Sequence, residues 1–305
     1  MKKSIKGPIY LFLCAFFWGI AFASQSNAMN YVEPYTFVFL RSVITCLVLS
    51  AFLPLLNRLN GRQETEPAPL RTHFIVGALC GTFLVLATIL QQIGIVSTTT
   101  AKSGFITALY IIIVPILGIF LKRKPAPTVW LGVVLSLAGL YFLCINEGLS
   151  INSGDLITLC SAFVFAIHIM LIDRLGSKLN SILLSAIQFG TAAVIAGVIT
   201  FIAETPSITS IFACWKDILF VAVISGALGF TLQIVGQKYT EPTLASLILC
   251  LESVFAAVGG WVLLNQTLSG RELFGCALML TASAIALLPE KAHDEKKRKI
   301  FSKTY

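Results

Sequence analysis

The stretch "GFITALYIIIVPILGIFLKRKPAPTVWLGVVLSLAGLYFL" (residues 104–143) contains two long apolar runs on either side of a short join that carries Lys122, Arg123 and Lys124. A helix needs about 20 mostly apolar residues to cross a lipid bilayer. The prolines and positive charges of the join are typical of a turn at a membrane surface. The stretch therefore predicts two transmembrane helices connected by a tight basic loop.

The rest of the chain follows the same pattern. Of its 305 residues, 57% are hydrophobic and only 12% are charged, whereas soluble domains carry about 25% charged residues. No loop is long enough to form a soluble domain. We therefore expect an all-α membrane protein with ten transmembrane helices at 8–28, 34–56, 73–95, 103–121, 128–145, 154–173, 181–203, 217–237, 242–264 and 271–289.

The positive charges predict the orientation of these helices. If both termini are cytoplasmic, 18 of the 22 Lys and Arg residues lie in cytoplasmic segments and 3 on the outer side, while Arg41 lies within a helix. This bias follows the positive-inside rule, so the net charge of +8 indicates topology and no nucleic-acid partner. We expect a multi-pass protein of the plasma membrane (bacterial inner membrane), with residues 290–305 as a basic cytoplasmic tail near anionic lipid.

The second half of the chain resembles the first half. The offset between matching segments stays between 142 and 147 residues: "FFWGIAF" (16–22) with "FVFAIHI" (163–169), "LQQIG" (90–94) with "LQIVG" (232–236), and "WLGVVLSLAG" (130–139) with "LFGCALMLTA" (273–282). The matches predict two repeats of five helices, at 8–145 and 154–289. Because five is odd, the second repeat must enter the membrane upside down, which is the arrangement of many transporters that work by alternating access.

One carboxylate interrupts the apolar stretch "ASLILCLESVFAAVGGW" (245–261). A charge at the middle of a bilayer costs about 2.5–3.5 kcal/mol on insertion scales. At helical spacing, Glu252 shares a face with Ala245, Ala256 and Gly259, small residues that favour close helix packing, so we expect it to point into the bundle. There it either binds a proton, a cation or an amine, or makes a structural hydrogen bond. The opposite face is expected to meet lipid: Leu247, Leu251, Val254, Phe255 and Val258.

Other polar residues are also predicted inside the membrane. Arg41 either neutralises Glu252, attracts a substrate carboxylate, or extends toward the outer headgroups. His168 suits proton relay or a packing hydrogen bond. The amides and one indole either line a cavity for a small amphipathic solute or connect helices: Trp18, Gln25, Asn27, Gln91, Gln92, Gln188, Gln233 and Gln237.

The motifs of ATP-driven and catalytic proteins are not found. The sequence has no G-x-x-x-x-G-K-[ST] phosphate loop, and no arrangement of nucleophile, base or paired acids stands out. His168 has no second ligand at metal spacing on its helix. We therefore expect no catalytic residue, metal or cofactor. A channel and an intramembrane enzyme remain distant alternatives, and the oligomeric state stays open.

Several segments together resemble the EamA family of the drug/metabolite transporter superfamily. They are "AFFWGIAFA" on the first helix, "FLRSVI" on the second, the opening stretch, "SGDLITLCSAFVFAIHIMLIDRL" on the sixth, and "SLILCLESVFAAVGGWVLLNQTLSGRELFGCALMLTASAIAL" on the last two. The resemblance covers nearly the whole chain as two EamA repeats, and it supports Trp18, Arg41, Pro115 and Glu252 as family-pattern positions. The family usually has Gly-Glu and a hydrophobic residue where this chain has Asn265, Gln266 and Thr267.

The resemblance implies ten helices, a central cavity and alternating access. Members of the family export amino acids and other small metabolites, and some import them. We therefore expect a secondary-active exporter of amino acids or related metabolites, with protons as a candidate coupling ion. Import or exchange of a sugar, a nucleoside or an amine is the alternative.

Overall fold

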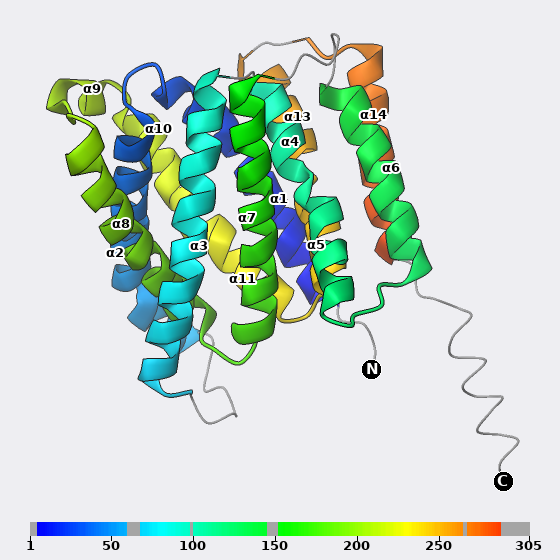
Figure 1. The fold of residues 1–305 in the computed structure, drawn as a ribbon, viewed down its shortest axis with the longest axis horizontal. Helices are drawn as coiled ribbons and strands as arrows, with labels where there is room; N and C mark the ends of the chain where they lie inside the picture. Colours follow the sequence, from blue (N-terminus) through cyan, green and yellow to red (C-terminus); the bar gives the residue numbers. More distant parts are fainter. Residues whose placement is uncertain (1–4, 60–67, 98–99, 145–151, 265–266, 288–305) are drawn as a thin grey trace, which may run out of the picture.

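The computed structural model describes residues 5–59, 68–97, 100–144, 152–264 and 267–287. All regular secondary structure in these ranges is helical (Figure 1), which confirms the predicted all-α class. The predicted tail at 290–305 and the departure from the family pattern at Asn265 and Gln266 lie outside the described residues.

The first half contains five membrane-crossing segments whose bounds follow the apolar runs. Its fourth segment is interrupted at Leu109, so that it consists of two helices. The elements are α1 (Lys6–Ala28), α2 (Pro34–Leu59), α3 (Leu70–Ser97), α4 (Thr100–Ala108), α5 (Tyr110–Phe120) and α6 (Pro127–Cys144).

The second half repeats this order with more interruptions. Its third crossing is built from α10, a π-helix and α11, and its fourth crossing is broken at Cys250 and Leu251. The elements are α7 (Ser153–Leu175), α8 (Ser181–Ala203), the short α9 (Ile208–Ala213), α10 (Trp215–Phe220), η1 (Val221–Phe230), α11 (Thr231–Gln237), α12 (Pro242–Leu249), α13 (Glu252–Leu264) and α14 (Gly270–Leu287).

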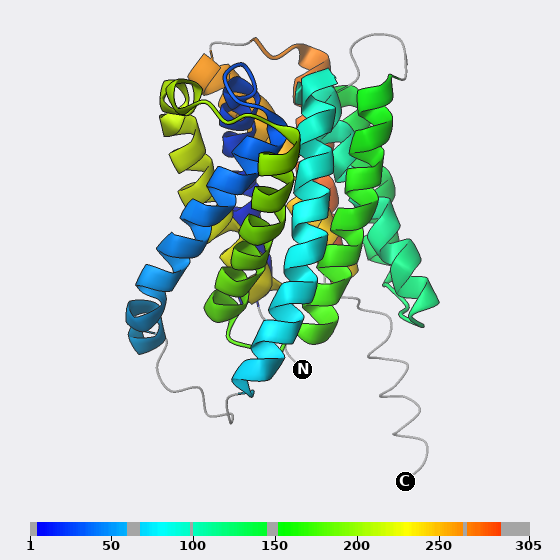
Figure 2. The ribbon, with the colours of Figure 1, turned by 60° about the vertical axis from the view of Figure 1, so that its left-hand side comes forward.

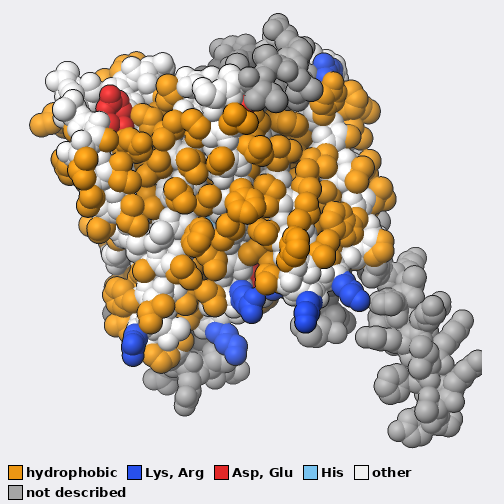
Figure 3. Space-filling model, viewed as in Figure 1, with side chains coloured by type: hydrophobic (Ala, Val, Ile, Leu, Met, Phe, Trp, Pro, Cys, Tyr) orange, Lys and Arg blue, Asp and Glu red, His pale blue; other side chains and the backbone are white. Residues whose placement is uncertain are grey.

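The described residues include nine stretches that are long and apolar enough to cross a membrane, and a shorter apolar helix at Pro127–Leu143. The outer surface between the two ends of the bundle is mostly apolar, as contact with lipid requires (Figure 3). Most of the Lys and Arg side chains on this face gather along one edge. We call this edge, where α1 begins and α14 ends, the basic end (Figure 1).

The two halves are interleaved, and their contacts obey the repeat. The second helices of the two repeats, α2 and α8, pack together, as do the fifth helices, α6 and α14. The third helix α3 packs on α7, and the equivalent third crossing of the other repeat, η1 with α11, packs on α1. Figure 2 shows α3 beside α7 and α2 beside α8. Two of these contacts thus join equivalent helices, and the contact of α3 with α7 is matched by that of η1 and α11 with α1. Inverted repeats are expected to pack in this way.

Small residues permit the closest of these contacts. A Cβ atom on Gly275 of α14 would lie 2.6 Å from the Gly139 carbonyl oxygen and 2.6 Å from the Leu143 nitrogen, both backbone atoms of α6. Backbone atoms inside a helix cannot move aside without disturbing its hydrogen bonds. The contact between α6 and α14 therefore depends on glycine at this position.

The expected lipid-facing side of the ninth predicted helix is wrong in part. Leu247, Leu251 and Val254 are buried, whereas Val258 is exposed and Phe255 is half-buried. The reason is that α12 lies among α1, α5, α6, α7 and α14, and α13 packs on α1 and α4, so that helices cover most of this crossing. Helical spacing identified one inward face but could not show that the other face is covered as well.

We predict that Gly275→Ala lowers the stability of the protein by about 1–3 kcal/mol, because the added methyl group overpacks a helix contact. The measurement is the apparent melting temperature of purified protein in detergent. Gly104→Ala is the matched control, since a Cβ atom there meets nothing within 4 Å. Equal melting temperatures for the two variants would contradict the close contact.

Candidate functional site

A cavity lies about halfway along the helices and extends toward the end opposite the basic end. Its volume is about 30 Å³, which is room for about one or two water molecules. The protein is thus contracted around the cavity in this conformation. The lining residues are Trp18, Phe22, Gln25, Arg41, Thr88, Gln91, Thr107, Tyr110, Phe165, Ile169, Ser225, Phe230, Gln233 and Glu252.

The repeat organises this lining. Ten of the fourteen residues form five pairs whose members occupy equivalent positions in the two halves, at the offsets of 142 and 147 residues found in the sequence. The cavity therefore lies on the pseudo-two-fold axis of the bundle. The pairs are Trp18 with Phe165, Phe22 with Ile169, Thr88 with Phe230, Gln91 with Gln233, and Tyr110 with Glu252.

One of these pairs is hydrogen-bonded. The Tyr110 hydroxyl donates to Oε1 of Glu252 over 3.1 Å. Each residue is the first of the helix that follows an interruption, Tyr110 in α5 and Glu252 in α13. Free backbone N–H groups at a helix N-terminus favour a negative charge, so the break in the ninth crossing stabilises a carboxylate that is only 4% exposed.

The opposite charge in the cavity belongs to Arg41. Its side chain is 3% exposed, and its Nη1 donates to Oε1 of Gln25 over 2.9 Å. Its guanidinium carbon lies 6.0 Å from the centre of the Phe37 ring. Within the described part of the chain no carboxylate forms an ion pair with it. A guanidinium has five N–H donors, so a buried Arg41 with one such bond is suited to hold an anionic group of a ligand.

The predicted amides divide into two groups. Gln25, Gln91 and Gln233 line the cavity, and Nε2 of Gln91 donates to Oγ1 of Thr107 over 3.3 Å. Gln92 and Gln237 lie outside the lining. Nε2 of Gln92 donates to the Gln25 carbonyl over 3.4 Å, and Nε2 of Gln237 donates to the Ile169 carbonyl over 2.9 Å.

His168 and Gln188 also lie outside the cavity lining. Both are fully buried, and Nε2 of His168 lies 3.2 Å from Oε1 of Gln188. This pair connects α7 to α8. Asn27 bonds to Asp217 near the end opposite the basic end, at 2.7 Å between its Nδ2 and a carboxylate oxygen.

Trp18 forms one wall of the cavity. Its Nε1 donates to the Ser225 carbonyl over 3.2 Å, and its ring centre lies 4.7 Å from that of Phe230. Both partners belong to the π-helix η1, a rare form that is frequently found at functional sites. A Cβ atom on Gly229 would come within 2.6 Å of Nε1 of Trp18, so glycine is needed there for the indole to approach the backbone.

Tyr110 was not singled out in the sequence because it is a single hydroxyl in an apolar run. The signal that identifies it is the repeat: residue 252 minus the offset of 142 gives residue 110. Among the described residues no group of three His, Cys, Asp or Glu side chains has the geometry of a metal site. The lining offers one cation, one carboxylate, amides and aromatic rings, which is suited to binding a small polar solute.

We predict that Gln188→Leu destabilises the protein more than Gln91→Leu does. The first change leaves Nε2 of His168 buried without a partner, which costs about 1–3 kcal/mol. The second leaves Thr107 facing the cavity, where water can replace the lost bond. Apparent melting temperatures of the two variants in detergent test this, and a larger loss for Gln91→Leu would contradict the assignment.

Comparison with known proteins gives consistent matches. The EamA-like transporter family matches residues 5–145 and 152–288. An uncharacterized transporter of Archaeoglobus fulgidus is 29% identical over 94% of this chain and 87% of its own length. The threonine/homoserine exporter RhtA of Salmonella typhimurium is 26% identical over 54% of this chain and 56% of its own length.

The fold has a counterpart among crystal structures. One protein solved by crystallography superposes with a TM-score of 0.74, at 18% identity over 92% of this chain and 96% of that chain. This likeness concerns the fold alone. Together with the two family matches and the apolar helices, it leads to one conclusion: the chain belongs to the EamA-like transporter family and is a membrane transporter.

Proposed function

We propose that the protein is a secondary-active exporter of amino acids or related small metabolites, which works by alternating access without ATP hydrolysis. In this proposal it lies in the cytoplasmic membrane with the basic end and both termini in the cytoplasm, as the distribution of Lys and Arg supports. The substrate binds in the central cavity, and protons are the candidate coupling ion.

The observation that carries this proposal is the pair of opposite charges in one cavity. Arg41 and Glu252 both line it and are nearly fully buried. A charge in the membrane interior is costly, so such residues are characteristic of substrate and ion pathways. A zwitterion, with a carboxylate and an ammonium group, offers a partner to each. An uncharged sugar would leave both charges unpaired, which supports an amino acid over the alternative.

The contracted cavity supports a carrier mechanism. A volume of about 30 Å³ cannot hold an amino acid, so binding requires the surrounding helices to separate. Because the lining consists of equivalent residues from two interleaved repeats, the same movement can open the cavity to either end. The similarity to a threonine/homoserine exporter supports amino acids as the substrate class and export as the direction.

We predict that Glu252→Gln reduces export roughly tenfold or more, because it removes the charge that holds an ammonium group or a proton. The amide oxygen still accepts from Tyr110, so the melting temperature should change little. Amino acids in the medium are compared among cells that produce wild type, Glu252→Gln or Glu241→Gln at equal membrane levels, and cells with empty vector.

Glu241→Gln is the control because Glu241 is an exposed carboxylate before α12. If wild type and Glu241→Gln enrich an amino acid outside and Glu252→Gln does not, both the direction and the role of Glu252 are supported. Wild-type activity of Glu252→Gln would remove Glu252 from the mechanism. Enrichment of a sugar or nucleoside instead would contradict the proposed substrate class.

A second prediction concerns Arg41. Replacement by Met keeps the length of the side chain but removes its charge and donors, so a carboxylate substrate loses a charge-assisted hydrogen bond of about 1.5–3 kcal/mol. We expect the KM for an amino acid to rise by roughly tenfold or more while that for its decarboxylated amine changes little, measured in vesicles. Equal changes for both substrates would show that Arg41 does not contact the carboxylate.

A further inference from the structure

The helix α7 carries a line of residues that leads from the cavity to the basic end. Phe165, Ile169 and Asp173 are four residues apart and therefore lie above one another on one face of the helix. The first two line the cavity. Asp173 is one turn closer to the basic end and near the C-terminus of α7, where the helix dipole disfavours a carboxylate. Its position therefore does not serve the stability of α7.

A second line of residues runs beside the first on α11. Gln233 lines the cavity, and Gln237, one turn closer to the basic end, donates from Nε2 to the carbonyl of Ile169 over 2.9 Å. In the described part of the structure the Oε1 atoms of both amides are buried and without a hydrogen-bond partner. Buried acceptors are rarely left in this state. These two amides are suited to bind a polar solute that passes between α7 and α11.

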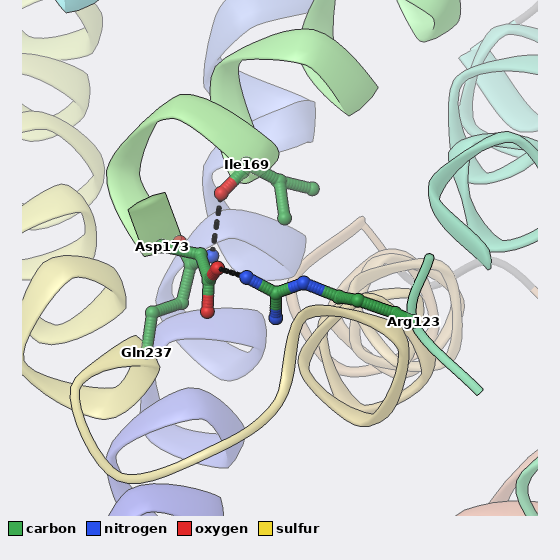
Figure 4. Close-up of polar contacts among 4 residues, drawn as sticks. All are labelled: Arg123, Ile169, Asp173 and Gln237. Carbon is green, nitrogen blue, oxygen red and sulfur yellow. Dashed lines mark hydrogen bonds and ion pairs between the residues drawn. The ribbon is translucent and has the colours of Figure 1, made fainter. Parts of the chain in front are cut away.

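Arg123, which follows α5 in the first repeat, contacts the residue at the end of the line on α7. Its guanidinium forms an ion pair with the Asp173 carboxylate (Figure 4). In the same view the amide of Gln237 reaches Ile169 next to the pair. The Asp173 side chain is 12% exposed and that of Arg123 is 39% exposed, so the carboxylate points inward and the cation covers it.

The backbone fixes the position of Arg123. At the end of α5, the N–H of Arg123 bonds to the Gly118 carbonyl over 2.9 Å and that of Lys122 to the Ile119 carbonyl over 2.8 Å. This is the Schellman motif, which usually has glycine where this chain has Lys122 at φ 60°. Arg123 also borders a surface hollow of about 530 Å³ lined with Lys122, Lys124 and Trp130, into which its side chain can move when the pair separates.

The pair breaks the symmetry of the repeats. At the offsets of 142 and 147 residues, the positions equivalent to Arg123, Asp173 and Gln237 carry Asn265, Ser26 and Ile95. None of these is charged. The ion pair at the basic end therefore has no charged equivalent in the other repeat.

From these observations we infer that substrate passes between the cavity and the basic end along a path that opens between α7 and α11, and that Arg123 and Asp173 form the gate that closes it. The inference rests on the proposed transport function. For substrate to pass, the ion pair must break and the Gln237 amide must leave the Ile169 carbonyl. The equivalent positions carry no charged residue in the sequence, so they cannot form an ion pair.

The test measures access to the path without measuring transport. Gln233→Cys places a thiol at the inner end of the path, and a membrane-impermeant maleimide is applied to membrane vesicles that expose the N-terminus. Labelling of the same protein without this cysteine is subtracted, because the chain has eight native cysteines. We expect Arg123→Gln and Asp173→Asn each to raise the labelling rate of Cys at 233 about tenfold, as expected for the loss of a charge-assisted bond.

The matched control is Arg174→Gln, since Arg174 is an exposed neighbour of Asp173. It should leave the labelling rate unchanged. The exchange Arg123→Asp with Asp173→Arg restores the attraction and should return the rate toward that of wild type. If a single variant fails to reach the membrane, the labelling rate of this charge-exchange variant still tests the gate.

The outcomes separate the gate from the transport function. Unchanged labelling in Arg123→Gln, or an equal rise in Arg174→Gln, overturns the gate even if the protein exports amino acids. Faster labelling that the charge exchange reverses supports the gate even if no amino acid is exported. Faster labelling in vesicles of the opposite orientation would overturn the assignment of the path to the basic end.

Discussion

The arrangement of this protein depends on the hydrogen bond between Tyr110 and Glu252. It connects equivalent positions of the two repeats, so it lies on the axis about which the halves are related. Both residues begin a helix after an interruption, and the free N–H groups at the start of α13 favour a negative charge at this depth. The interruptions of the fourth and ninth crossings, the contact between these crossings and the cavity therefore meet at this one carboxylate.

Hydropathy was sufficient to predict most of the fold because the membrane imposes a length and an apolar composition on every crossing. The predicted bounds of the seventh crossing, 181–203, agree with α8. The interruptions at Leu109 and at Cys250 and Leu251 could not be predicted in this way, since the composition stays apolar through them. The burial of Leu247 and Leu251 depends on how many helices surround α12, and no property of that segment alone reports it.

The candidate site was predictable where a residue is costly in lipid. Arg41, Glu252 and the amides of Gln91 and Gln233 attract attention by polarity, and all four line the cavity. Polarity does not separate these from His168 and Gln188, which lie outside the cavity lining and contact each other between α7 and α8. That distinction depends on which neighbour each side chain reaches. Phe22, Phe165 and Phe230 in the lining resemble ordinary core in the sequence, and only their equivalence to other lining residues in the opposite repeat reveals them.

Differences between the two repeats have a consequence for the direction of transport. When two inverted repeats exchange conformations, residues at equivalent positions exchange environments. A free-energy difference between the states open at either end therefore comes from positions that carry different residues in the two repeats. Arg123 and Asp173 meet this condition, and their attraction favours the state closed at the basic end. In the proposed mechanism, a substrate arriving from that end has to bind strongly enough to offset one ion pair, and the equivalent positions of the other repeat carry no charged residues with which to form a second one.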